Sequence, residues 1–346
     1  MRQRYQKISA LLLLSAALCM GMSVGTAAEE NVEAAEYETT AVQETEAGAE
    51  AEENVEAAEY EAAGSESAEA DTEETVESER AGKEDTMVTP ITELVDSYLA
   101  GRAELGENWA VSIEDLTTGE VYNYNAAVQQ QSASVIKVFI MGAVYERLLY
   151  PTSDEMAIPY SGDSSTLRSL VESMITVSDN ECANRLVELL GQEDFEKGAE
   201  VVNQFCADHG FDEVHLGRRF LAVDPADDNY ISAGDCRAIL SDIYHRRLVN
   251  EMASEMMQEY LNRQERTWKI PAGLPADYTS GNKTGEVYGD NGLGYIENDM
   301  ALVYSPYGDY VLAIASSNLD GRNDEADQVI QKISADVAQW FAEKHA

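Results

Sequence analysis

The stretch Ser134-Val-Ile-Lys137 places a serine and a lysine three residues apart at the head of an apolar run that continues to Tyr145. The run predicts a buried helix, on which positions i and i+3 share a face, so the hydroxyl and the amine are expected to meet. A serine nucleophile needs a neighbouring base, and burial lowers the pKa of a lysine enough to make its amine that base. Ordinary composition gives about one S-x-x-K by chance in a chain of this length, and Ser280 to Lys283 is a second one.

Two further motifs follow this stretch in order. Ser178-Asp-Asn180 stands at the N-terminal end of a helical segment, where these residue types also serve as ordinary helix caps. Lys283-Thr-Gly285 ends a predicted strand, and its glycine permits close approach of another backbone. Each motif alone has a structural explanation, but all three in this order, 44 and 105 residues apart, favour a single catalytic site.

S-x-x-K, S-D-N and K-T-G in this order resemble the penicillin-recognising serine enzymes, and most closely the class A β-lactamase-like family. The resemblance covers residues 87–346 and includes Met174-Ile-Thr-Val-Ser-Asp-Asn180, Asn184, and Lys283-Thr-Gly-Glu-Val287. It implies the α/β (α+β) fold of β-lactamases and transpeptidases, an antiparallel sheet flanked by helices beside an all-helical subdomain. Ser280 then lies three residues before Lys283 on a strand, where their side chains point to opposite faces and cannot cooperate.

The resemblance implies an acylation chemistry for the first group of residues. Ser134 would attack the carbonyl of a β-lactam or a D-alanyl peptide, and Lys137 would take its proton. Ser178 would relay a proton towards the leaving nitrogen. Lys283, as a second cation nearby, would help to keep Lys137 neutral.

The resemblance also implies a set of substrate-binding residues: Asn180, Lys283, Thr284, Gly285 and Glu286. Asn180 would bind the side-chain amide of the substrate, and Lys283 with Thr284 would bind its carboxylate. The backbone N–H groups of Ser134 and Glu286 would form the oxyanion hole, with each donor worth about 3 kcal/mol.

The sequence departs from the family at the residue that activates water. In class A β-lactamases, a glutamate in a long loop, followed closely by an asparagine, activates the water that hydrolyses the acyl-enzyme. The comparable loop here is 216–230, and alignment on Arg218 puts Phe220 at the glutamate position, with Asn229 further on. The loop offers three aspartates as substitutes, which are equally explained as solvated residues and caps: Asp224, Asp227 and Asp228. Acylation is therefore better supported than deacylation.

The N-terminus predicts export. Arg2, Arg4 and Lys7 precede an apolar segment, and small residues follow at 25–28, which is the layout of a secretory signal over residues 1–28. The alternative is an uncleaved membrane anchor, for which the apolar core is short. A secreted or cell-surface protein is expected.

Residues 29–86 have a different composition. They hold 22 acidic and two basic residues, a net charge of −20, and repeat A-E-E-N-V-E-A-A-E-Y-E at 28–38 and 51–61. Such a segment buries too little apolar surface to offset the entropy of ordering it. It is predicted to be a disordered spacer.

Residues 87–346 are expected to form one catalytic domain. Predicted helices cover 92–104, 194–209, 233–248 and 324–344, predicted strands cover 109–114, 121–124, 278–283, 300–304 and 310–316, and a loop covers 217–232. Strands at both ends with helices between them predict one sheet with an inserted helical subdomain, and a site in the crevice between them.

Composition limits the partners of this domain. Its net charge of −25 argues against nucleic acid or an anionic membrane as ligand. Its four histidines form no zinc motif, and no cofactor or metal is expected. Cys182, Cys206 and Cys236 allow one bridge or none. A monomer acting on a β-lactam or D-alanyl peptide, with peptidoglycan as a further partner, is expected. Two alternatives to a β-lactamase stay open: a cell-wall D,D-peptidase that forms an acyl-enzyme and resembles penicillin-binding proteins, and a catalytically idle, surface-tethered binding module.

Overall fold

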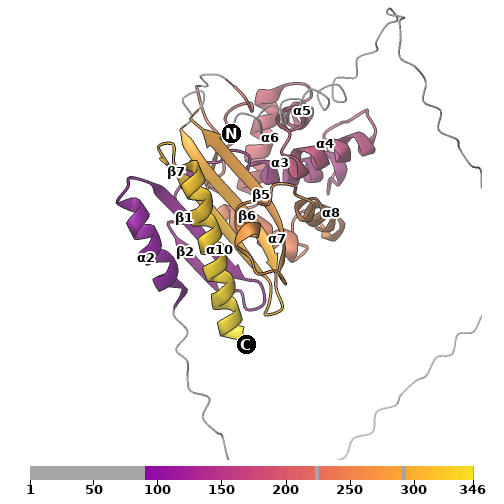
Figure 1. Ribbon diagram of the computed structural model, residues 1–346. Helices are drawn as coiled ribbons and strands as arrows, with labels where there is room; N and C mark the ends of the chain where they lie inside the picture. Colours follow the sequence, from indigo (N-terminus) through magenta and orange to yellow (C-terminus); the bar gives the residue numbers. More distant parts are fainter. Residues whose placement is uncertain (1–89, 223–225, 290–293, 346) are drawn as a thin grey trace, which may run out of the picture. The chain divides into compact units, whose positions relative to one another are not determined.

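The computed structural model describes residues 90–222, 226–289 and 294–345. Its main sheet is antiparallel, five-stranded and ordered β2-β1-β7-β6-β5 (Figure 1). The strands are β1 (Asn108–Asp115), β2 (Val121–Tyr124), β5 (Thr279–Tyr288), β6 (Tyr295–Tyr304) and β7 (Tyr310–Ser317). β1 pairs with β7 from Asn108↔Ser317 to Asp115↔Tyr310, so the sheet joins the two ends of the domain as predicted.

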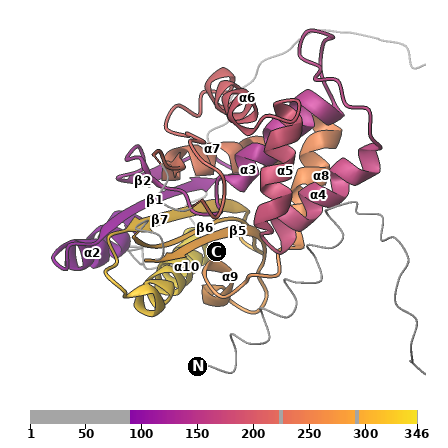
Figure 2. The ribbon, with the colours of Figure 1, turned by 90° about the horizontal axis from the view of Figure 1, so that it is seen from above.

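One face of this sheet is covered by α2 (Ile91–Ala103), α9 (Ile270–Gly273) and α10 (Asn323–His345) (Figures 1 and 2). On α10 the buried stripe has the predicted helical spacing: Val329, Ile333, Val337 and Phe341. It packs with Trp109 and Ile314 of the sheet in one apolar cluster. Burial of an apolar stripe against a sheet face is what holds such a terminal helix in place.

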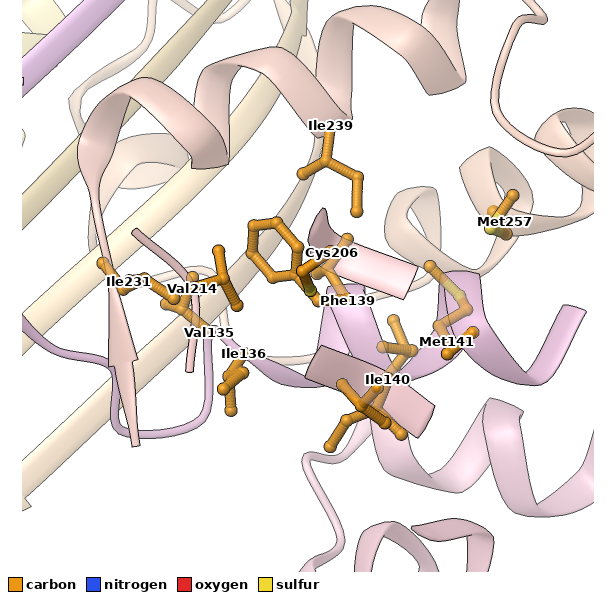
Figure 3. Close-up of a cluster of buried hydrophobic side chains, with 14 of the residues drawn as sticks. Val135, Ile136, Phe139, Ile140, Met141, Cys206, Val214, Ile231, Ile239 and Met257 are labelled. Carbon is orange, nitrogen blue, oxygen red and sulfur yellow. The ribbon is translucent and has the colours of Figure 1, made fainter. Parts of the chain in front are cut away.

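The other face carries the helical part of the fold, which the sequence predicts as an inserted subdomain (Figure 2). Its elements are α3 (Lys137–Val144) with a π-helical turn at Tyr145–Leu149, α4 (Ser164–Thr176), α5 (Asn180–Leu190), α6 (Phe195–Asp208), α7 (Ala233–Tyr244) and α8 (Glu251–Asn262). Five of these helices begin with a side-chain cap on a backbone N–H: Asp163, Asp179, Asp194, Ser232 and Asn250. Every residue of α3 is buried. Figure 3 shows Phe139 and Met141 of α3 among side chains from α6, α7 and α8.

Close packing around α3 gives a stability prediction at Gly142. A Cβ there would lie 2.5 Å from Cζ of Phe205 on α6, closer than real contacts allow. We expect Gly142→Ala to destabilise the domain by about 1–3 kcal/mol, because overpacking outweighs the better helix propensity of alanine. Gly101 on α2 is the matched control, since a Cβ there meets nothing within 4 Å. Gly101→Ala should instead be neutral or slightly stabilising in urea denaturation, and equal effects of the two substitutions would contradict the packing argument.

The structure changes the predicted elements in several places. α8 and α9 lie outside the predicted helices, β5 continues past Gly285 to Tyr288, and β6 begins at Tyr295. α3 begins at Lys137, and Ser134 lies in the preceding turn, where the Lys137 N–H donates to the Ser134 carbonyl oxygen at 3.3 Å. A short ladder of β3 (Gln130–Gln131) and β4 (Tyr230–Ile231), absent from the prediction, ties the long loop to the chain just before Ser134. Two-residue strands carry no periodicity by which a sequence pattern could detect them.

The three cysteines of the domain lie in its helical part. Cys182, Cys206 and Cys236 are buried, and Cys206 and Cys236 are free thiols. Burial raises the pKa of both Cys206 and Cys236, so they remain protonated.

Among residues 90–345, as far as they are described, no helix combines the length and apolarity needed to cross a membrane. The predicted signal (1–28) and spacer (29–86) lie outside the described residues.

Candidate active site

The amine of Lys137 is the centre of the site. It enters from the first residue of α3 and is completely buried. Its Nζ lies 3.1 Å from Oγ of Ser134, 3.2 Å from Oγ of Ser178, 2.8 Å from the Ser178 carbonyl oxygen and 2.7 Å from Oδ1 of Asn180. The turn preceding α3 thus brings Ser134 and Lys137 together as predicted, and the S-D-N segment completes the set.

The surroundings of Lys137 favour its neutral form. Burial lowers the pKa of Lys137 well below its usual value, and the nearby positive charges of Lys283 and Arg266 add to this effect. A neutral amine has two N–H groups and one lone pair. The Ser178 carbonyl and Asn180 Oδ1 only accept, so they take the two N–H groups. The lone pair is left for a hydroxyl proton, which is the arrangement a base needs.

Ser178 occupies the strained turn between α4 and α5. Its φ of 62° lies in the left-handed region, which non-glycine residues seldom adopt. The next residue, Asp179, caps α5 by accepting from the N–H of Cys182 at 2.7 Å. This cap holds the turn so that Ser178 Oγ faces Lys137 on one side and Lys283 Nζ, at 2.8 Å, on the other. Strained backbone of this kind is retained where the surrounding structure fixes it.

Lys283 reaches the site from β5, and its Nζ donates to Ser178 Oγ and to the Thr284 carbonyl oxygen, the latter at 2.7 Å. Ser280 lies on the same strand, as predicted. Complete burial lowers the pKa of Lys283 to about 7, with Glu286 opposing and Arg266 reinforcing the shift. Thr284 is also buried, and none of the described residues hydrogen-bonds its Oγ1. Lys283 and Thr284 are consecutive residues of β5, so their side chains leave the strand on opposite faces, and joint binding of a carboxylate by the two stays a prediction.

The backbone of β5 runs against the turn that carries Ser134. A Cβ at Gly285 would lie 2.9 Å from both the Ser134 nitrogen and the Ser132 carbonyl oxygen, so only glycine permits this approach. The side chain of Asn298 on β6 donates to the carbonyl oxygens of Gln131 and Ser132, at 3.0 and 3.2 Å. The N–H of Ser134 and the strand residues 285–286 are therefore held next to each other.

Phe220 lies where its alignment predicts, beside the reacting groups. Its N–H donates to Asn184 Oδ1 at 2.9 Å, and Asn184 Nδ2 donates back to the Phe220 carbonyl oxygen at 3.3 Å. This clamp on α5 fixes the backbone and turns the ring inwards, so that the ring centroid lies 4.7 Å from Lys137 Nζ. An apolar ring, only 7% exposed, thus occupies the space beside the base.

The loop aspartates have other partners. Asp228 accepts from Arg218 Nε at 2.6 Å and from Gln131 Nε2 at 3.3 Å. Asp227 pairs with His215 at 2.7 Å. Both carboxylates therefore bind residues of the loop or its base, while Asp224 lies outside the described residues. The proposal that one of them activates water stays a prediction without a supporting contact.

The structure adds three site residues that the sequence interpretation missed: Arg266, Lys269 and Glu297. Arg266 pairs with the Glu286 carboxylate, and Lys269 is buried against the back of β5 and β6. Glu286 also contacts Lys269, and although its burial opposes ionisation, the charges of Lys269, Arg266 and Lys283 lower the pKa of Glu286 to about 2. No motif marks these residues, because their partners come from distant parts of the chain.

Among the described residues, no group of three or more His, Cys, Asp or Glu could hold a metal ion.

Comparisons with known proteins identify the family. The sequence model of the β-lactamase enzyme family matches residues 90–341. A β-lactamase of Streptomyces fradiae is 26% identical over 254 residues, which cover 66% of this chain and 78% of that protein. A β-lactamase of Streptomyces lavendulae is 25% identical over 255 residues, covering 66% and 80%.

Solved structures share the fold at lower identity. The β-lactamase from Sphaerobacter thermophilus has a TM-score of 0.60 at 23% identity, over 73% of this chain and 98% of its own. PBP-A has a TM-score of 0.56 at 21% identity, over 68% and 91%. A leucine-to-glutamate mutant of PBP-A, solved as its acyl-enzyme with penicillin G, has a TM-score of 0.60 at 20% identity, over 73% and 96%. With its match to the family model over residues 90–341, the chain belongs to the β-lactamase enzyme family, and its fold and motifs are those of the class A β-lactamase-like group.

Proposed function

We propose that this member of the family is an exported serine hydrolase that is acylated at Ser134 by β-lactams and releases the acyl group slowly. The contact that carries acylation is the buried Lys137 amine, 3.1 Å from Ser134 Oγ. Slow release follows from the Phe220 ring beside that amine. β-Lactamase activity with inefficient turnover is thus the first candidate, and a D,D-peptidase resembling penicillin-binding proteins is the second, favoured by the same ring.

Acylation proceeds through the groups around Lys137. Its lone pair takes the proton of Ser134 Oγ as the oxygen attacks the carbonyl carbon. The N–H groups of Ser134 and Glu286 stabilise the resulting oxyanion. Ser178 then passes a proton to the leaving nitrogen as the C–N bond breaks, and it is reprotonated from Lys137. The product is an ester on Ser134, and Lys137 returns to its neutral form.

Intact-mass spectrometry of the purified chain with a penicillin tests this proposal. We expect one penicilloyl group to add within minutes and to persist for hours, with Ser134→Ala as the variant that remains unlabelled. Absence of any adduct with penicillins and cephalosporins would favour the idle binding module. Rapid loss of the adduct, with turnover of a chromogenic cephalosporin, would instead indicate an efficient β-lactamase.

Binding of an anionic substrate should depend on the charge of Lys283. Because the pKa of Lys283 is about 7, it is mostly charged at pH 6 and mostly neutral at pH 8. We expect the dissociation constant of a penicillin for Ser134→Ala to rise about tenfold over this range, in proportion to the charged fraction. Titration calorimetry at the two pH values measures this. A Ser134→Ala/Lys283→Met variant should bind weakly and without this pH dependence, and a flat profile with Lys283 present would exclude it as the carboxylate-binding cation.

A further inference from the structure

Lys269 is a fully buried cation directly behind the strands of the site. It precedes α9, and its side chain is 0% exposed. Its Nζ donates to the carbonyl oxygens of Gly285 (3.0 Å) and Asn298 (3.1 Å), and it pairs with Glu297 Oε2 at 2.6 Å. The contact with Glu297 is an ion pair without hydrogen-bond geometry, and the third hydrogen bond of the ammonium goes to Glu286 Oε2 at 3.4 Å.

The bond to Gly285 acts on the peptide group that carries an oxyanion donor. The carbonyl of Gly285 and the N–H of Glu286 belong to the same peptide unit. A cation on that carbonyl draws electron density through the amide and makes the N–H a stronger donor. Lys269 therefore increases the partial positive charge of the Glu286 N–H, although it has no contact with the space in which a substrate would lie.

The hydrogen bond to Asn298 connects Lys269 with the segment that carries the second oxyanion donor, the Ser134 N–H. Gly285 and Asn298 are direct partners in the β5–β6 ladder, so one ammonium links both strands at that register position. The Asn298 side chain donates to the Gln131 and Ser132 carbonyl oxygens, and this turn leads into Ser134. Lys269 thus braces the two backbone segments whose N–H groups converge on the oxyanion.

Neighbouring carboxylates keep Lys269 protonated, and backbone hydrogen bonds of the next residue fix its position. Burial opposes its protonation, but Glu286 and Glu297 outweigh this and raise the pKa of Lys269 above its usual value. The next residue is fixed as well, because the Ile270 N–H donates to Asp299 Oδ2 at 3.0 Å and the Ile270 carbonyl accepts from Ser334 Oγ at 2.8 Å. The ammonium is therefore charged and preorganised before any substrate arrives.

We propose that Lys269 is a positioning residue that polarises the Gly285–Glu286 peptide and fixes both donors of the oxyanion hole. This rests on the proposed acylation of Ser134. The expected contribution to the acylation rate constant is about tenfold, less than the loss of a whole oxyanion donor, because the N–H itself remains.

The test is the carbonyl stretch of the acyl-enzyme, measured by infrared difference spectroscopy on the full chain acylated with a penicillin labelled with ¹³C at its lactam carbonyl. Lys269→Met alone would leave Glu297 buried and unpaired, so the test variant is Lys269→Met/Glu297→Gln, which removes both charges. We expect a shift to higher wavenumber and acylation about tenfold slower, with less than a twofold change in the preceding binding step. Lys332→Met is the control, because Lys332 is half-exposed on α10 and pairs there with Asp336.

The outcomes separate this inference from the proposed function. If the wild-type chain is not acylated, the proposed function fails first. If it is acylated and the double variant has the wild-type stretch and rate, Lys269 has no role in the oxyanion hole. If the double variant does not fold, the single variant Glu297→Gln provides the test. It removes a negative charge beside Lys269, so the ammonium polarises the Gly285–Glu286 peptide more strongly, and the carbonyl stretch should shift to lower wavenumber. An unchanged stretch there would overturn the inference.

Discussion

Replacing Lys137 with methionine is expected to slow acylation of Ser134 by about 10⁴-fold, the upper range for loss of a general base. Methionine fills the buried volume with an unbranched apolar chain, so the loss reports the amine and not a cavity. The Nζ of Lys137 lies within 3.2 Å of both Ser134 Oγ and Ser178 Oγ, so the substitution removes the proton acceptor that is in hydrogen-bond contact with the nucleophile. Stopped-flow or quenched mass spectrometry with excess penicillin measures the rate constant.

A folding measurement accompanies this substitution and shows whether the amine is neutral. The pKa of Lys137 in the folded protein lies well below its value in the unfolded chain, mainly because the amine is buried. Between those two pKa values the unfolded state binds more protons, so stability rises with pH in this window. Urea denaturation should show a smaller gain from pH 7 to pH 9 in Lys137→Met than in the wild-type chain. An equal gain, or acylation slowed less than tenfold, would mean that Lys137 is not the base.

Replacing Phe220 with glutamate is expected to speed loss of the penicilloyl group by about 10²- to 10³-fold. The backbone of residue 220 is clamped by Asn184, so the new side chain should point where the ring now lies, 4.7 Å from Lys137 Nζ. A carboxylate there can take a proton from a water beside the Ser134 ester. The ring offers no such acceptor.

The matched control for this prediction is Phe220→Gln, which has the shape of glutamate but no basic carboxylate. Removal of the ring alone admits water, and the glutamine variant measures that contribution. The adduct lifetime by intact mass, together with steady-state turnover of a chromogenic cephalosporin, compares the three proteins. Equal lifetimes for the glutamate and glutamine variants would show that residue 220 does not control deacylation.

The sequence was informative where local chemistry sets the structure. The Ser134–Lys137 pair depends on one turn of chain, and Asp179 caps a helix within three residues. The strand assignment of Ser280 to Lys283 rejected the second S-x-x-K by geometry alone. Strand patterns at both ends of the domain also predicted the joined sheet, because short runs of apolar, β-branched and aromatic residues bounded by turn residues are readable from the sequence.

Alignment placed Phe220 at the water-activating position, but only packing shows what the ring does there. Its inward orientation depends on Asn184, which lies 36 residues away on α5. Likewise, Asp227 and Asp228 were candidates until their contacts with His215 and Arg218 showed other partners. Side-chain direction is decided by tertiary hydrogen bonds, which spacing along the chain does not report.

By itself, the sequence determined the order of the motifs and the Ser134–Lys137 pair, because the pair depends on one turn of chain. That Ser178 and Lys283 also lie at this pair followed from the resemblance of the three motifs to the family, and not from local geometry. The tertiary structure decided the surroundings of Ser134-Val-Ile-Lys137: burial that lowers the pKa of the Lys137 amine, an aromatic ring beside that amine, and a buried cation behind β5. Lys269 and Asn298 have no motif, since their effect depends on reaching carbonyl oxygens brought together by the β5–β6 ladder. The protonation state of Lys137 is equally a property of the folded state, because burial sets it and a linear chain has no interior.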